Sequence, residues 1–272
     1  MELQNPNDIK VVVRGGGDLA TGVAYRLYRS GFKVIVTELE NPLVVRRTVS
    51  LAQTIYQDQI EIEDLTGQLA DNSEEAIRLI DEGVVPVLID PTADIIEYWK
   101  PTVVVDATMN KKNGAGTELS DAPLVLGLGP GFEAGKDVDA VIETQRGHHL
   151  GRVIYQGRAL PNTGIPGVVN GVGRKRVIYS PEEGVFKTQR EIGQMIEVGE
   201  VIGWINETPI YAKISGCIRG LLKSGVKVNS NVKIGDIDPR EDDTFCYTIS
   251  DKALAMGGGV LEGILTFLSR QK

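Results

Sequence analysis

Runs of consecutive aliphatic residues recur through the first half of the chain, separated by stretches whose apolar positions follow the helical period. Uninterrupted apolar strands are typical of parallel sheets that helices cover on both faces. The pattern therefore predicts a Rossmann-like, doubly wound α/β domain over residues 1–168. We expect its strands at residues 9–14, 33–38, 84–89, 103–106 and 123–128, and its helices at 18–30, 43–55 and 74–81.

The pattern changes in the second half of the chain. Between residues 169 and 240 the apolar segments are short and are separated by glycine and turn residues, which predicts a small β domain without helices. Residues 241–272 then predict a helical segment that packs on the first domain. Its Gly257–Gly259 run and Gly263 are poor helix formers, so they imply either very close packing on another element or a break in the helix.

A glycine-rich loop follows the first predicted strand. Gly15, Gly17 and Ala20 fit the spacing G-x-G-x-x-G/A, with Asp18 at the start of the next helix. Glycines let a phosphate approach the backbone, and the N-terminus of a helix attracts anions. Glu38 ends the second strand, where an acid accepts hydrogen bonds from ribose hydroxyls. The loop predicts a nucleotide-type ligand; the alternative is a turn that serves only close packing of the helix on the sheet.

Two further clusters follow later strands, at the sheet edge where open α/β folds bind ligands. Asp106 directly follows an apolar strand, and Lys111 and Asn113 come soon after, either to hold an anionic group or as a solvated turn. The next strand runs into a loop that is either an anion-binding nest of backbone N–H groups or a structural tight turn. This loop contains Gly127, Gly129 and Gly131.

A third cluster places a carboxylate, arginines and a histidine within ten residues. Glu143 ends a strand, and Arg146, His148 and Arg152 follow it. Arginine suits bidentate binding of phosphate, and histidine exchanges protons near neutral pH, although a surface position explains His148 equally well. The candidates for catalysis are Asp106, Glu143 and His148. The candidates for ligand binding further include Arg46 in the second predicted helix, and Asn162 and Thr163 in a loop that could cover the site.

The composition of the chain limits its partners and its location. A net charge of −8 argues against non-specific binding of nucleic acid or of an anionic membrane. The sequence shows no signal-peptide pattern and no apolar run of about 20 residues, so we expect a cytoplasmic protein. Two cysteines cannot build a disulfide framework. Two adjacent histidines, without a CxxC or HxxxH spacing, predict no metal site.

The segments 12–24, 38–50, 106–113, 127–152 and 161–167 together resemble the YqeB family, which is associated with selenium-dependent molybdenum hydroxylases. The α/β part is also similar to the Rossmann half of XdhC-type proteins, although the N-terminal domain usual in those proteins is absent. The resemblance implies an accessory role in maturation or insertion of the molybdenum cofactor. It implies a molybdopterin dinucleotide or another nucleotide as ligand, bound through Gly15–Ala20 and Glu38, and a hydroxylase subunit as partner. Homo-oligomerisation is left open.

The β domain resembles the biotinyl/lipoyl barrel-sandwich fold in residues 210–218, 226–229 and 234–237. The hairpin tip 206–209 lacks the lysine that a carrier domain acylates, so we expect neither covalent biotin nor lipoate. The domain is then a scaffold, a docking surface or a wall of the ligand site. Cys217 and Cys246 are expected to be small buried residues rather than thiols for sulfur or selenium transfer.

Two other functions stay open from the sequence. An NAD-dependent oxidoreductase would use Glu38 to favour NAD over NADP, although the chain has no Tyr-x-x-x-Lys pair. An interaction module would use the β domain to recognise a hydroxylase subunit, which is compatible with the accessory role.

Overall fold

The computed structural model describes residues 5–110 and 113–270, which form two compact units. The first unit comprises the chain up to Pro42, Ser50–Asn162 and the residues from Ile249 onward. The second comprises Leu43–Val49 and Thr163–Thr248. This division differs from the expected one chiefly in the short segment Leu43–Val49, which leaves the α/β part and joins the β part.

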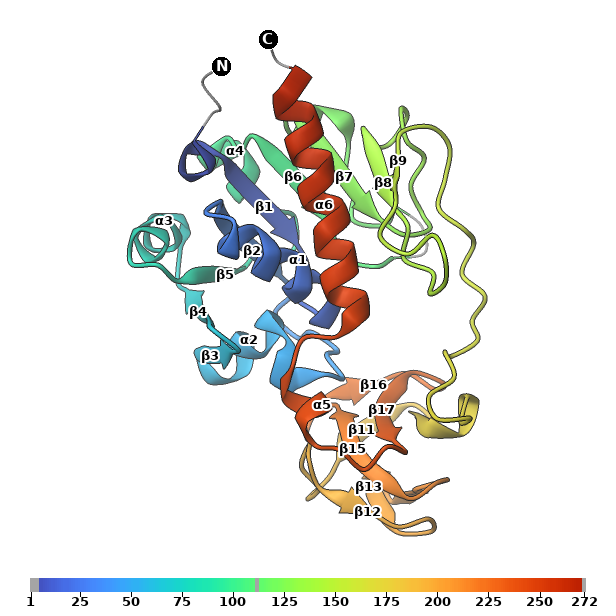
Figure 1. Ribbon diagram of the computed structural model, residues 1–272. Helices are drawn as coiled ribbons and strands as arrows, with labels where there is room; N and C mark the ends of the chain where they lie inside the picture. Colours follow the sequence, from blue (N-terminus) through green and yellow to red (C-terminus); the bar gives the residue numbers. More distant parts are fainter. Residues whose placement is uncertain (1–4, 111–112, 271–272) are drawn as a thin grey trace. The chain divides into compact units, whose positions relative to one another are not determined.

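The first unit is built on a nine-stranded, mostly parallel sheet, which confirms the predicted mixed α/β class (Figure 1). The strand order is β3-β4-β5-β2-β1-β6-β7-β8-β9, and only the outermost strands β3 and β9 pair antiparallel. The strands are β1 (Lys10–Arg14), β2 (Lys33–Glu38), β3 (Gln59–Ile62), β4 (Leu65–Ala70), β5 (Val85–Ile89), β6 (Val103–Asp106), β7 (Leu124–Leu128), β8 (Ala140–Ile142) and β9 (Val153–Ile154).

Both faces of this sheet are covered, because successive residues of its central strands point to opposite sides and are all buried. Val12, Val104 and Val125 form one row across β1, β6 and β7, and they pack with Leu79 and Trp99 in a single core. Their neighbours on the strands face the opposite layer and are equally buried. The helices are α1 (Asp18–Arg29), α2 (Thr54–Gln57), α3 (Ser73–Asp81), α4 (Ile95–Trp99) and α6 (Asp251–Arg270).

Helix α6 is continuous over twenty residues and runs alongside α1, as Figure 1 shows. Its glycines allow this approach. A Cβ at Gly257 would lie 2.5 Å from the carbonyl oxygen of Gly22, and one at Gly22 would lie 2.5 Å from the Cβ of Ala253. A Cβ at Gly259 would likewise collide with the carbonyl oxygen of Gly151. The poor helix formers therefore mark close packing and not a break.

One helical stretch in the described residues, Thr244–Arg270, is long and apolar enough to cross a membrane by length and composition alone. The expectation that no run reaches this length is therefore corrected. The stretch includes α6, whose buried side packs against α1, β7, β8 and β9 within the first unit. A core helix of a folded domain passes the same length and composition test.

The second unit contains two four-stranded antiparallel sheets and one short helix, α5 (Thr244–Tyr247). Its core draws on both sheets, for example on Ile218 and Ile237 of one and on Phe186 and Ile202 of the other. One sheet has the order β10-β17-β15-β12, with β10 (Val177–Tyr179), β17 (Lys233–Asp238), β15 (Gly216–Leu221) and β12 (Met195–Ile196); the other has β14-β13-β11-β16, with β14 (Thr208–Tyr211), β13 (Val201–Ile205), β11 (Gly184–Lys187) and β16 (Lys227–Val228).

The helix predicted over residues 43–55 does not form. The carbonyl oxygen of Val45 accepts a 2.7 Å hydrogen bond from Leu221 N, and Arg47 donates through Nε to the carbonyl oxygen of Leu221. The carbonyl oxygen of Val45 therefore bonds to β15, where in a helix it would bond to the N–H four residues further on. Only two 3₁₀ turns, at Arg47–Val49 and Leu51–Gln53, and the four-residue α2 remain.

The contact between α1 and α6 predicts opposite effects at two neighbouring glycines. Gly257→Ala should destabilise the protein by about 1–3 kcal/mol, because backbone must move to admit the methyl group. The methyl group of Gly258→Ala meets no atom of the described residues within 4 Å, and this change should stabilise the protein by up to about 1 kcal/mol through helix propensity. Urea unfolding followed by circular dichroism measures both. Equal midpoints for the two variants would show that the helices are not in this close contact.

Candidate functional site

The glycine loop after β1 lies where the strand order reverses, since β1 pairs with β2 on one side and with β6 on the other. Gly15 has φ +91°, and a Cβ there would lie 3.2 Å from the Cα of Thr108, in the loop after β6. The loops after β1 and β6 are therefore in backbone contact. Such a reversal point is where open α/β sheets leave a crevice at the carboxyl ends of their strands.

Glu38 fastens the glycine loop to the end of β2. Its Oε1 accepts a hydrogen bond from Gly16 N at 2.9 Å, and its Oε2 accepts one from Leu39 N at 2.6 Å. Burial raises the pKa of this carboxyl, and the two backbone N–H groups oppose that rise. The carboxylate thus has a structural task in the loop. Its predicted role as a ribose acceptor stays a prediction.

The segment after Ser50 covers one side of the same loop. Ala52 N donates to the carbonyl oxygen of Gly16 at 2.8 Å, and a Cβ at Gly16 would collide with Ala52 N. The hydroxyl of Thr21 accepts a bond from Leu51 N and donates to the carbonyl oxygen of Gly17. By contrast, a Cβ at Gly17 would meet no atom of the described residues within 4 Å. The open side of the loop is therefore at Gly17.

Asp106 is fully buried and organises the loop that follows it. Its Oδ1 accepts bonds from the backbone N–H and the hydroxyl of Thr108, and its Oδ2 accepts one from the hydroxyl of Thr117 at 2.6 Å. The Thr117 hydroxyl in turn accepts a bond from Arg14 Nη1 at 2.7 Å.

Asn113 holds the same loop from its other side of the sequence: its side-chain amide donates to the carbonyl oxygen of Thr117 and accepts from Thr117 N. Arg14 and Thr117 were not among the predicted residues, and Lys111 lies outside the described ones.

Two of the three glycines at the end of β7, Gly127 and Gly129, have close contacts that leave no room for a side chain. A Cβ at Gly127 would lie 2.6 Å from the ring of Phe132, and one at Gly129, where φ is +77°, would lie 2.6 Å from Oγ1 of Thr144. Gly129 N donates to the carbonyl oxygen of Ile142, and Gly131 has φ +125°. These contacts favour the tight turn that the sequence left open beside the anion nest.

The cluster after β8 divides into a buried carboxylate and exposed side chains. Glu143 is 2% exposed and accepts bonds from Gln145 N and Leu160 N. Arg146 forms a bidentate ion pair with Asp251, at 2.7 and 2.9 Å. His148 and Arg152 of this cluster are exposed, and the ring of His148 is edge-on to that of His149. Asn162, predicted in the loop that follows, is exposed as well.

The sequence reading missed Lys252, a half-buried lysine in the first turn of α6. Burial and the neighbouring Arg146 lower the pKa of its ammonium group, while Asp18 and Glu143 oppose that shift. Lys252 is thus a cation within electrostatic reach of the start of α1 and the end of β8. No strand-end motif marks it, because α6 reaches the sheet from the far end of the chain.

Arg46 and Thr163, which were expected at the same site, belong to the second unit. Arg46 is buried there and donates through Nη2 to the carbonyl oxygen of Phe245 at 2.8 Å. Thr163 accepts a bond from Ile165 N. Among the described residues, no group of three or more His, Cys, Asp or Glu side chains could hold a metal ion.

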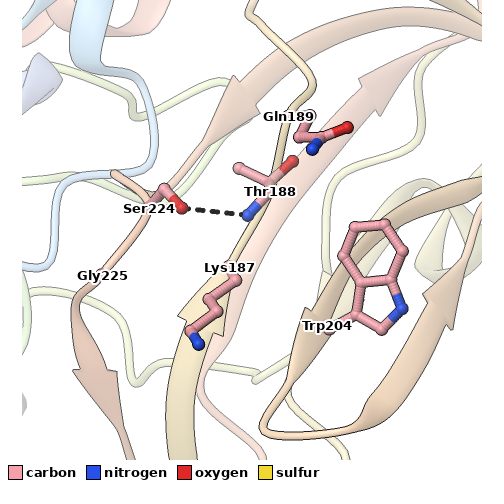
Figure 2. A pocket seen from close by; sticks show the side chains of 6 residues that line it. All are labelled: Lys187, Thr188, Gln189, Trp204, Ser224 and Gly225. Atoms are coloured by element: carbon pink, nitrogen blue, oxygen red, sulfur yellow. Dashed lines mark hydrogen bonds between the residues drawn. The ribbon is translucent and has the colours of Figure 1, made fainter.

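The second unit has two open hollows, of about 460 and 410 Å³, and Trp204 lines both. Figure 2 shows the larger one, in which Ser224 Oγ accepts a 3.0 Å bond from Thr188 N. No predicted site residue lines either hollow. The larger is lined by Lys187, Thr188, Gln189, Trp204, Ser224 and Gly225, and the smaller by Gln189, Arg190, Gln194, Val201, Ile202 and Trp204.

The uncharacterized protein YqeB of Escherichia coli strain K12 is 47% identical to this chain over 258 residues. The match covers 95% of this chain and 48% of YqeB, so the chain spans about half the length of that relative. Over nearly its whole length the chain is therefore similar to one part of YqeB. No family model matches the chain.

Solved structures resemble the chain only weakly. The E. coli tRNA N6-threonylcarbamoyladenosine dehydratase TcdA in complex with ATP is 18% identical over 47% of this chain and 53% of its own, with a TM-score of 0.31. An aspartoacylase family protein from Mesorhizobium loti is 15% identical over 84% of each chain, with a TM-score of 0.28. At these scores the similarities support no inference about function.

The buried link between Arg14 and Asp106 predicts the effect of losing one hydroxyl. Thr117→Val should cost about 1–3 kcal/mol of stability, because it leaves both charged groups without their shared partner. Thr66→Val, on the half-buried face of β4, is the matched control and should change stability by less than about 0.5 kcal/mol. Urea unfolding compares the two. A Thr117→Val cost no larger than the control would rule out the link.

Proposed function

We propose that the first unit is a Rossmann-like domain that binds a phosphate-bearing, dinucleotide-type ligand at the carboxyl edge of its parallel strands. The open backbone at Gly17, at the N-terminus of α1, carries the proposal. A phosphate would approach there, with Lys252 as the nearby cation. The contact between the loops after β1 and β6 supports a crevice beside it.

The N-terminus of α1 lacks a cap that another helix of the unit has. Helix α3 is capped by Asn72, whose Oδ1 accepts a bond from Glu75 N at 2.9 Å. The N-cap residue of α1 is Gly17, and among the described residues no side chain caps this helix. A phosphate oxygen at this position would accept hydrogen bonds from first-turn N–H groups of a twelve-residue helix, at the favourable end of the helix dipole.

Lys252 supplies the charge that the loop itself does not provide. Asp18 stands in the first turn of α1 and would repel an anion, and Glu143 adds a second negative charge nearby. The ammonium group of Lys252 offsets both. A bound phosphate would in turn favour the protonated lysine, because an added anion opposes the desolvation that lowers its pKa.

We further propose that this binding serves maturation or insertion of the molybdenum cofactor of selenium-dependent molybdenum hydroxylases, in the cytoplasm. The ligand would then be a molybdopterin dinucleotide, which carries a pyrophosphate and a ribose. The second unit would be a barrel-sandwich-like domain that presents a surface to a hydroxylase subunit. The resemblance of the sequence to the YqeB family supports this role, and the 47% identity to YqeB of Escherichia coli supports that resemblance.

The geometry favours binding over an NAD-dependent oxidoreductase activity. Asp106 and Glu143, two of the three candidates for acid–base chemistry, already accept hydrogen bonds from their own loops. The third, His148, is exposed. Hydride transfer needs an acid or base held against a substrate, and these side chains instead hold the loops that surround the crevice.

The decisive variant is Gly17→Ala, because φ at Gly17 is −64° and open space surrounds it, so the fold admits the methyl group. Titration calorimetry with NAD⁺, ADP and a molybdopterin dinucleotide should show binding of at least one of them. Gly17→Ala should weaken that binding at least about tenfold, since the methyl group displaces a phosphate. Gly258→Ala is the matched control and should bind normally. Absence of binding by the whole panel, or equal affinity of Gly17→Ala, would refute the site.

The affinity for that ligand should also fall at alkaline pH. Binding favours protonated Lys252, so affinity is full below the lowered pKa of this lysine and is lost as pH rises through it. The decline should therefore begin below the ordinary lysine value of 10.5. Lys252→Gln should weaken binding at neutral pH and abolish the decline, whereas Lys33→Gln, on the exposed pair with Asp81, should do neither. An unchanged decline in Lys252→Gln would assign it to another group.

A further inference from the structure

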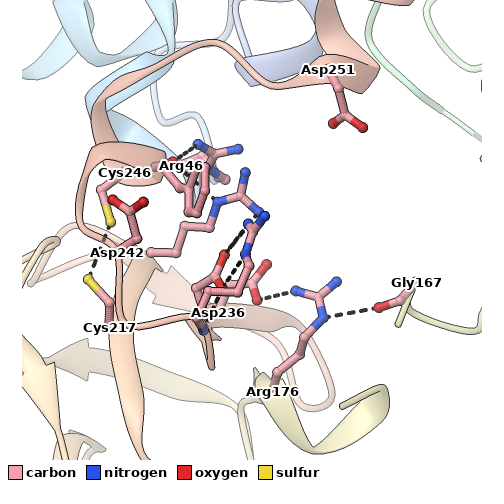
Figure 3. A network of polar contacts seen from close by, with 12 residues as sticks. Arg46, Gly167, Arg176, Cys217, Asp236, Asp242, Cys246 and Asp251 are labelled. Atoms are coloured by element: carbon pink, nitrogen blue, oxygen red, sulfur yellow. Dashed lines mark hydrogen bonds and ion pairs between the residues drawn. The ribbon is translucent and has the colours of Figure 1, made fainter. Parts of the chain in front are cut away.

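We propose that Cys217 and Cys246 form a reversible disulfide bond within the second unit. They are the two cysteines of the chain, and their Sγ atoms lie 3.5 Å apart (Figure 3). Both are fully buried members of the core of this unit. The thiols are therefore in direct contact in the reduced protein, although 28 residues separate them in the chain.

The backbone on both sides of the pair holds the sulfurs together. Cys217 stands on β15, between β12 and β17, and Cys246 stands on α5. The carbonyl oxygen of Phe245 accepts bonds from Arg46 and from Arg219, and that of Cys246 accepts one from Thr48. Helix α5 is thus fixed by hydrogen bonds to β15 and to the segment Leu43–Val49 before any covalent bond forms. A disulfide of about 2.05 Å needs only a further approach of about 1.5 Å.

The oxidant that the reaction needs is a low-molecular-weight disulfide such as glutathione disulfide. One cysteine loses its proton, and its thiolate attacks the oxidant and releases one glutathione thiolate. The second cysteine, deprotonated in turn, attacks the mixed disulfide and releases the other. Two protein thiols are oxidised to one S–S bond, one glutathione disulfide is reduced to two glutathione molecules, and the two cysteine protons end on the two glutathione thiolates.

Burial makes this a slow modification. It raises the pKa of both thiols, that of Cys246 to about 12, so the reactive thiolate is scarce in the closed fold. Glutathione disulfide reaches the sulfurs only when α5 opens away from β15. The rate should therefore rise with mild denaturant and should level off as the oxidant concentration increases. For the same reason reductants reduce the finished bond slowly, when α5 opens.

The consequence is a covalent tie between α5 and a central strand of the second unit. Helix α5 is the last element of that unit, and the chain continues from it into α6 of the first. In the reduced protein hydrogen bonds and packing alone hold this exit point. In the oxidised protein local opening at α5 would be suppressed, because the bond closes the loop between the two cysteines.

The test is to incubate the full chain with glutathione disulfide, with and without mild urea, and to measure its intact mass and its alkylatable thiols after denaturation. The expected product has lost two hydrogens, about 2 Da, has no alkylatable thiol, shows a higher melting temperature and regains both thiols with dithiothreitol. Cys217→Ser and Cys246→Ser are the matched controls, and each should give only a mixed disulfide with glutathione.

Three outcomes for the wild-type chain would overturn the proposal. They are two free thiols after oxidation in mild urea, mixed disulfides with glutathione at both cysteines, and disulfide-linked dimers on non-reducing gels. The wild-type mass and thiol count decide between these and the expected product, even if a serine variant fails to fold.

Discussion

The close approach of α6 to α1 is the constraint on which the first unit depends. The two helices come together because Gly22 and Gly257 have no side chains, so backbone meets backbone where any larger residue would collide. Dispersion contacts are strongest at such short range, and the helices bury apolar faces along their length. This approach also brings the last element of the chain to the first βα turn, and with it Lys252 to the neighbourhood of Asp18.

The parallel sheet and its glycine turn were predictable because their signals are local. Val11–Val13 and Val103–Val105 are uninterrupted apolar runs, and a run of this kind in a covered sheet is buried on both sides. The helix expected over 43–55 does not form for a tertiary reason, since Val45 and Arg47 bond to Leu221 of β15, which is 174 positions beyond Arg47 in the chain. A window of neighbouring residues carries no information about such a partner.

The candidate site shows the same division between local and distant information. Their positions at the ends of predicted strands placed Glu38, Asp106 and Glu143 at the edge of the sheet. Their residue types did not reveal that each carboxylate accepts hydrogen bonds from the loops around it. A carboxylate that must hold a loop and one that must meet a ligand look alike in a sequence. No sequence pattern predicted Lys252 at this site, because its position depends on how α6 packs.

The proposed function joins these observations through one physical idea, that an uncapped helix N-terminus beside a half-buried lysine suits a phosphate. Titration of the isotope-labelled protein with ADP, followed through its backbone amide resonances, tests this most directly. The first-turn amides of α1, from Gly17 to Leu19, should shift together with that of Lys252. Shifts confined to other residues, or no shifts at saturating ADP and at saturating NAD⁺, would contradict it.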